Sequence, residues 1–129
     1  MTKLSDGVGA YGERRAVDYL TNQAGMWVVD RNWRCREGEL DIVARDGDDL
    51  VFIEVKTRRG PGFGGPAEAV VPDKVRRLRR LAAAWLAAHP LVARRHGDRN
   101  RCGEVRFDVV CVYRPRRGPA LVYHVRAAF

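Results

Sequence analysis

Two short stretches of the chain combine charged and apolar side chains in strict alternation. Glu39 and Asp41 alternate with apolar residues in the stretch ELDIV, and Glu54 and Lys56 do so in the stretch IEVK. Successive side chains of a β-strand point to opposite faces, so each charged pair is expected to share one face of its strand. The sequence therefore predicts two strands with one charged and one apolar face, with Leu40 and Ile42 together on an apolar face.

A strong turn signal joins these two stretches. The residues DGDD at 46–49 favour a hairpin, and a four-residue loop there pairs Arg45 with Leu50. Counting back along both strands gives two further facing pairs: Asp41 with Glu54 and Glu39 with Lys56.

Facing carboxylates at the positions of Asp41 and Glu54 suggest a metal site. Facing side chains of paired strands have Cβ atoms about 4.5–5.5 Å apart, where two carboxylates repel each other. A divalent cation such as Mg²⁺ or Mn²⁺ removes this conflict and prefers hard oxygen ligands. The alternative is a solvated strand face with alternating charges. Apolar opposite faces on both strands favour the metal site.

Two further charged residues fall on apolar helical stripes. Glu13 shares the stripe of an expected helix at 5–24, where a carboxylate is costly without a partner. Its alternative role is an N-terminal charge that the helix dipole favours. Lys74 lies near the inward stripe of an expected helix at 72–89, and the alternative is an end-of-helix charge that reaches water.

The order of expected elements is αβββαββ, which predicts a single α/β domain over residues 1–129 with a mixed central sheet. Residues 58–66 read as a glycine-rich loop, and residues 91–103 as a mobile basic loop. The five expected strands are 27–33, 39–45, 50–57, 105–113 and 121–125.

The charge distribution favours a polyanionic partner, most simply nucleic acid. The net charge of +8 divides into −3 over residues 1–57 and +11 over residues 58–129. Three cysteines without a CxxC pair argue against a disulfide framework. No stretch resembles a signal peptide or a membrane span, so we expect a cytoplasmic protein that does not bind membranes.

The assembled residues resemble the PD-(D/E)xK pattern of restriction-endonuclease-like nucleases, and in particular the arrangement of archaeal Holliday-junction resolvases. The chain is most similar to the bacterial YraN family of endonuclease-like proteins. One departure is Leu40, which stands in place of the proline of "PD". The matching stretches are Gly12-Glu13, RNWRC at 31–35, GELD at 38–41, FIEVKTR at 52–58, Phe63-Gly64, Ala69-Val70, Lys74, RFDV at 106–109 and Ala128-Phe129.

The resemblance implies a restriction-endonuclease-like fold, with helices flanking the sheet and the site beside the central hairpin. Asp41, Glu54 and the backbone carbonyl of Val55 are then expected to hold Mg²⁺ or Mn²⁺, with Glu13 as a further ligand. Lys56 is expected to orient the attacking water, and Glu39 to lie in the outer shell. The residues expected to bind nucleic-acid phosphates are Arg58, Arg59, Lys74, Arg76, Arg77 and Arg80.

Three functions are consistent with this pattern. The first is a metal-dependent endonuclease that cuts DNA by structure or with weak sequence specificity. The second is a non-catalytic nucleic-acid-binding protein that retains the fold and the carboxylates, and the third is a module whose basic face binds an acidic protein. Resolvase-like relatives suggest a homodimer, because paired cuts require two sites.

Overall fold

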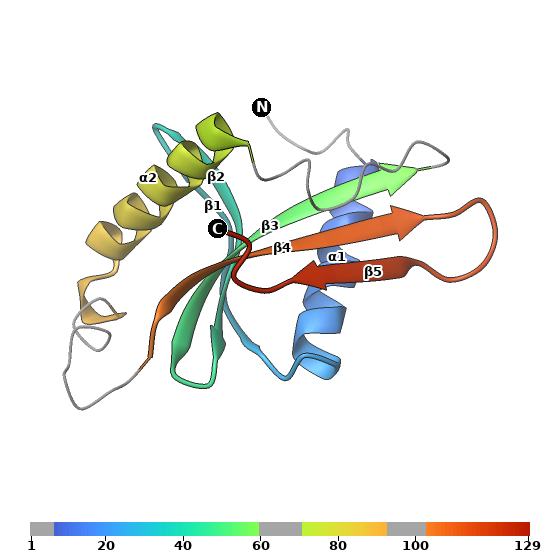
Figure 1. The fold of residues 1–129 in the computed structure, drawn as a ribbon, viewed down its shortest axis with the longest axis horizontal. Helices are drawn as coiled ribbons and strands as arrows, with labels where there is room; N and C mark the ends of the chain where they lie inside the picture. Colours follow the sequence, from blue (N-terminus) through green and yellow to red (C-terminus); the bar gives the residue numbers. More distant parts are fainter. Residues whose placement is uncertain (1–6, 60–70, 93–102) are drawn as a thin grey trace.

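The computed structural model describes residues 7–59, 71–92 and 103–129 (Figure 1). Two helices and five strands follow one another in the predicted αβββαββ order. The elements are α1 (Gly7–Asn22), β1 (Trp27–Cys35), β2 (Gly38–Asp46), β3 (Asp49–Arg59), α2 (Pro72–Ala88), β4 (Val105–Arg114) and β5 (Leu121–Val125).

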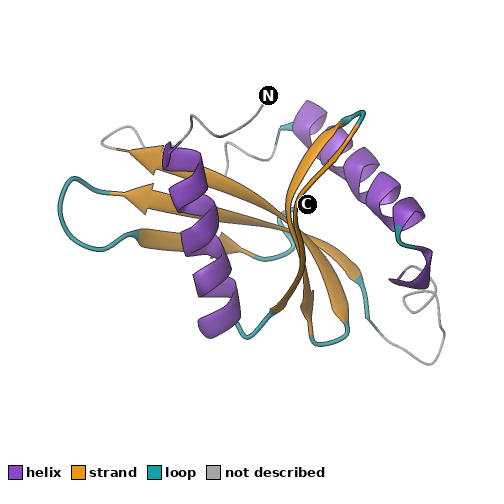
Figure 2. Ribbon diagram, turned by 180° about the vertical axis from the view of Figure 1, so that it is seen from behind, coloured by secondary structure: helices purple, strands orange, loops and turns teal. Residues whose placement is uncertain are grey.

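The five strands form one mixed sheet in the order β1-β2-β3-β4-β5. All neighbours are antiparallel except β3 and β4, which run parallel because α2 lies in the connection between them. Helix α1 covers the face formed by Val51 and Ile53, and α2 packs on the opposite face with Leu50 and Phe52 (Figures 1 and 2). The α/β class with a mixed sheet is therefore confirmed.

Helix α1 ends at Asn22, two residues before the predicted end. The backbone N–H groups of Gln23 and Ala24 both donate to the Tyr19 carbonyl, which closes the last turn. Gly25 follows with φ of +70°, a backbone conformation that favours glycine over residues with a side chain. Gly25 thus ends the helical segment, as predicted, by adopting a left-handed conformation. Residues 5 and 6 of the predicted helix lie outside the described residues.

The hairpin between β2 and β3 has the predicted register, with Arg45 opposite Leu50. Its turn is tighter than predicted, because Asp46 and Asp49 also pair and Gly47 adopts φ of +61°. The prediction that a loop begins at residue 58 is wrong, since β3 extends to Arg59 through its parallel pairing with β4.

Strands β2 and β3 separate after the pair Ile42–Ile53. Beyond this point β2 pairs only with β1, and a two-stranded ribbon twists more strongly than a wide sheet. As a result Leu40 packs in the core under α2, whereas Ile42 packs in the core under α1. The prediction that Leu40 and Ile42 share one face is therefore wrong. The predicted ladder pairs beyond Ile42–Ile53 are not formed.

Helix α2 presents the predicted apolar stripe to the sheet. Leu78, Ala82 and Trp85 are buried, and Trp85 donates its indole N–H to Asp30 of β1 at 2.8 Å. The C-terminal tail closes the edge of this core, with the Phe129 ring stacked on Phe107. Residues 91 and 92, predicted as part of a mobile loop, belong to a short helical turn, and residues 93–102 lie outside the described part of the chain.

A close contact between α1 and β3 predicts a strict requirement for Gly12. A Cβ atom at this position lies 2.8 Å from Thr57 Cβ and meets Thr57 Oγ1 as well, so no rotation of the threonine relieves the overlap. We expect Gly12→Ala to lower the free energy of unfolding by about 1–3 kcal/mol. Urea denaturation measures this loss. In a Thr57→Ala background the same substitution should cost less, and equal costs in both backgrounds would contradict the contact.

Candidate functional site

Asp41 lies where β2 leaves β3, and its carboxylate bridges the gap between the two strands. The backbone N–H of Val55 donates to Asp41 Oδ2 at 2.9 Å. The side chain thus takes the place of a main-chain acceptor that the departing strand no longer supplies. This bond fixes the carboxylate beside the Glu54-Val55-Lys56 segment, which the sequence had predicted as its neighbour.

Glu54 and Lys56 lie together on the α2 side of β3. Glu54 is only 9% exposed, and its Oε2 lies 3.4 Å from Lys56 Nζ. Lys74 of α2 completes this group: burial lowers its pKa, the nearby Lys56 lowers it further, and Glu54 acts in the opposite direction. The structure therefore brings two ammonium groups to one buried carboxylate.

Glu13 occupies the buried stripe of α1, as its spacing predicted. It is 8% exposed, beside the fully buried Ala16 and Leu20. In the orientation that satisfies both groups, the Asn32 amide donates to both Glu13 oxygens, at 3.0 and 3.2 Å. Asn32 has φ of 51°, which asparagine adopts more readily than most residues. Sequence reasoning assigned no role to this partner of Glu13.

The oxygen donors near Asp41 and Glu54 suit a hard cation. Asp41 uses one oxygen for the Val55 N–H, and the donor set of two carboxylates and a backbone carbonyl is of the type that Mg²⁺ prefers. Within residues 7–59, 71–92 and 103–129, no three side chains of Asp, Glu, His or Cys form a metal-binding group. Mg²⁺ usually keeps several waters and takes one or two carboxylates plus substrate phosphate, so it does not need a third carboxylate.

The remaining predicted residues lie around this cluster or away from it. Glu39 accepts a bond from Arg34, its partner on β1, at 2.9 Å, and the predicted pairing with Lys56 is absent from the β2–β3 ladder. Arg58 is half-buried and donates to the Thr57 carbonyl. Arg76 pairs with Asp73 within the first turns of α2. The side chains that are exposed to solvent, as phosphate binding requires, are Arg59, Arg76, Arg77 and Arg80.

A second charged cluster, which the sequence did not predict, centres on Asp108. This residue is fully buried and accepts two bonds from Arg106, at 2.9 and 3.0 Å. His124 Nε2 lies 2.8 Å from its second oxygen, and the Ala127 N–H donates to the first at 3.0 Å. Tyr19 bonds the other ring nitrogen of His124. The cluster ties α1, β4, β5 and the C-terminal tail together, which indicates a structural role.

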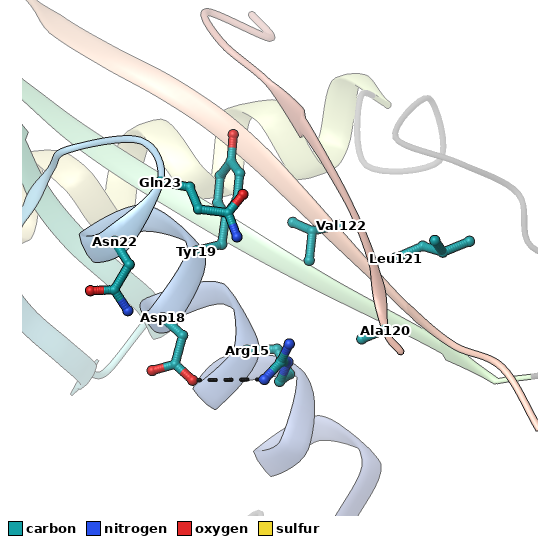
Figure 3. A pocket seen from close by; sticks show the side chains of 8 residues that line it. All are labelled: Arg15, Asp18, Tyr19, Asn22, Gln23, Ala120, Leu121 and Val122. Atoms are coloured by element: carbon teal, nitrogen blue, oxygen red, sulfur yellow. Dashed lines mark ion pairs between the residues drawn. The ribbon is translucent and has the colours of Figure 1, made fainter. Parts of the chain in front are cut away.

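A pocket of about 510 Å³ between α1 and β5 lies apart from the candidate site (Figure 3). Its polar lining comes mainly from one face of α1, where Arg15 and Asp18 form an ion pair at 4.0 Å. None of the predicted site residues lines this pocket. Its volume alone therefore does not make it the functional centre.

Comparison with known proteins identifies the family. The family model described as "Uncharacterised protein family UPF0102" matches residues 12–112. The chain belongs to UPF0102. A UPF0102 protein of Kineococcus radiotolerans is 58% identical over 95% of this chain and 93% of its own length. A UPF0102 protein of Streptomyces griseus is 56% identical over 92% of this chain and 92% of its own length. A UPF0102 protein of Frankia alni is 54% identical over 98% of this chain and 98% of its own length.

The UPF0102 match covers the entire candidate site. The matched residues include the three carboxylates and both lysines described above: Glu13, Asp41, Glu54, Lys56 and Lys74. In the described part of the chain, no helix is long and apolar enough to cross a membrane.

Proposed function

We propose that this UPF0102 protein is a Mg²⁺- or Mn²⁺-dependent endonuclease of the PD-(D/E)xK type that acts on DNA. The observation that carries the proposal is the Asp41–Val55 bond, which fixes a carboxylate beside the Glu54–Lys56 ion pair. One cluster thus combines ligands for a hard cation with ammonium groups that attract phosphate. The resemblance to nucleases quoted above supports the same reaction.

In this proposal each residue of the cluster has a separate task. Asp41, Glu54 and the Val55 carbonyl hold the cation, which when bound supplies a water of lowered pKa and positive charge at the scissile phosphate. Lys56, 3.4 Å from Glu54, orients the water or neutralises charge that develops on the phosphate. Lys74 adds a second positive charge from α2. Glu13, held by Asn32, positions α1 against β1.

The expected substrate is DNA recognised by its shape. Arginine contacts with phosphates position a duplex without reading its bases, so cleavage is expected to be structure-selective or weakly sequence-specific. We propose a cytoplasmic protein that acts as a homodimer when both strands of a junction are cut. Light scattering in the presence and absence of a four-way junction measures that assembly.

A cleavage assay tests the proposal directly. The wild-type protein is incubated with single-stranded, flap, four-way-junction and linear duplex DNA, and with RNA of the same sequence, in Mg²⁺, Mn²⁺ or EDTA. We expect metal-dependent cleavage of at least one DNA structure and none in EDTA. Binding of all substrates without cleavage in either metal would overturn the proposal and support the non-catalytic nucleic-acid-binding protein.

A further inference from the structure

Three arginines line one pocket at the C-terminal ends of β3 and β4. The pocket has a volume of about 290 Å³ and is lined by Arg59, Arg114, Pro115 and Arg116. We call it the arginine pocket. Among the described residues that line it there is no carboxylate, and all three arginines are exposed to solvent. The pocket therefore presents a concentrated positive charge at the surface.

The fold holds two of these arginines in place. Arg59 and Arg114 are partners in the parallel β3–β4 ladder, so their side chains emerge next to each other. The Arg114 guanidinium lies over the Tyr11 ring of α1, 4.8 Å from its centroid. Pro115 follows directly and restricts the backbone that leads to Arg116. The cluster is thus a fixed feature of this end of the sheet.

Several other arginines of the protein have acidic partners. Arg106 and Arg126 both bind Asp46, and Arg34 binds Glu39. Among the described residues, none of the three pocket arginines forms an ion pair with a carboxylate. Like charges that converge without a counter-charge repel one another, and a bound anion relieves this repulsion. The planar arginine fork matches phosphate oxygens in particular.

We propose that the arginine pocket binds a backbone phosphate of the nucleic acid that occupies the candidate active site. This inference rests on the proposed function, because it places both sites on one substrate. Strand β3 carries both, and Glu54 and Arg59 lie about 17 Å apart along it, which is about half a turn of B-form duplex. They project to opposite faces of the strand, so the duplex crosses the end of the sheet to reach both.

A salt titration of DNA binding tests the arginine pocket. The probe is a fluorescent DNA duplex of about 20 base pairs in EDTA, and its Kd is measured at several NaCl concentrations. Each lost phosphate contact should reduce the magnitude of the slope of log K against log salt by about 0.9. Arg114→Gln/Arg116→Gln disrupts the one phosphate site of the pocket, so it should reduce that magnitude by up to about 0.9. Arg15→Gln/Arg36→Gln is the matched control, since it removes two exposed arginines outside the pocket.

The outcomes separate the possibilities. A slope of smaller magnitude in the pocket variant alone supports the pocket. Arg114→Lys, which keeps the positive charge and leaves Arg116 unchanged, should then have a slope closer to that of the wild type. Equal slopes for the two double variants overturn it. Polyglutamate serves as a second probe that mimics an acidic protein. If the pocket variant loses binding to polyglutamate while its DNA binding is unchanged, the proposal is overturned and an acidic protein partner is supported. Thermal melting of each variant verifies that it is folded.

The pocket and the proposed reaction can fail separately. A slope of smaller magnitude in a protein that cuts no DNA leaves the arginine pocket standing and overturns the nuclease. Metal-dependent cleavage by the wild type, with equal slopes for the two double variants, leaves the nuclease standing and overturns the pocket.

Discussion

Glu54→Gln is expected to reduce kcat for DNA cleavage by about 10³-fold, which corresponds to about 4 kcal/mol of transition-state stabilisation. The substitution keeps the size of the side chain and removes only its charge. It therefore removes one proposed metal ligand and the partner of Lys56 together. Single-turnover cleavage in Mg²⁺ measures the chemical step, and DNA binding in EDTA should be retained, because the phosphate contacts come from other residues.

Asp41→Asn provides the sharper test of the same site. The asparagine carbonyl still accepts the bond from the Val55 N–H, so the connection between β2 and β3 is preserved while the negative charge is lost. We expect a loss of cleavage similar to that of Glu54→Gln. We also expect Mg²⁺ to raise the Tm of the wild type and not that of the variant, which tests metal binding without activity.

Glu37→Gln is the matched control for both variants, since Glu37 is exposed in the turn before β2. It should cleave DNA at the wild-type rate. Full activity of Asp41→Asn and Glu54→Gln would show that these carboxylates only connect strands and balance charge. Activity lost equally in all three variants would point to a general effect of charge and would also contradict the proposed site.

Local sequence features were sufficient to predict the frame of the site. The turn at 46–49 determined the register of Arg45 with Leu50, and strand alternation placed Glu54 and Lys56 on one face. The amphipathic stripe of α2 predicted which side of that helix is buried. These features depend on neighbours in sequence, and the period of a strand or a helix reports them directly.

Features that depend on tertiary geometry could not be predicted from the same patterns. Leu40 and Ile42 pack on different faces because β2 twists after it leaves β3. Strand periodicity does not show where two paired strands separate. Asn32 reaches Glu13 only because β1 passes beside α1. In the sequence, Asp108 stands out only as part of the family-matching stretch RFDV. Its role depends on His124, which lies on a different strand, so neighbouring residues do not reveal it.

Asp108→Ala is expected to lower the free energy of unfolding by about 3–5 kcal/mol, because it removes a fully buried carboxylate that the half-buried Arg106 binds with two hydrogen bonds. His124 and the Ala127 N–H lose an acceptor in the same change. Urea denaturation at neutral pH measures the loss. Asp48→Ala, in the exposed turn between β2 and β3, is the control and should change stability by less than about 0.5 kcal/mol.

The charge of Asp108 also predicts how stability depends on pH. Burial raises the pKa of Asp108, but hydrogen bonds from His124, Arg106 and the Ala127 N–H outweigh it and lower the pKa from 3.8 to about 2. The folded state therefore binds this proton less readily than the unfolded chain. The resulting stabilisation of about 2 kcal/mol is present above pH 3.8 and is lost as the pH falls through about 2.

Comparison with Asp108→Asn isolates this contribution from those of Asp46 and Asp49, which also contact Arg106 and titrate in acid. The asparagine retains an acceptor oxygen but cannot ionise. The difference in unfolding free energy between wild type and variant should shrink as the pH falls below about 4. A difference that stays constant down to about pH 2 would show that Asp108 stabilises the fold through its shape and hydrogen bonds, with no contribution from its charge.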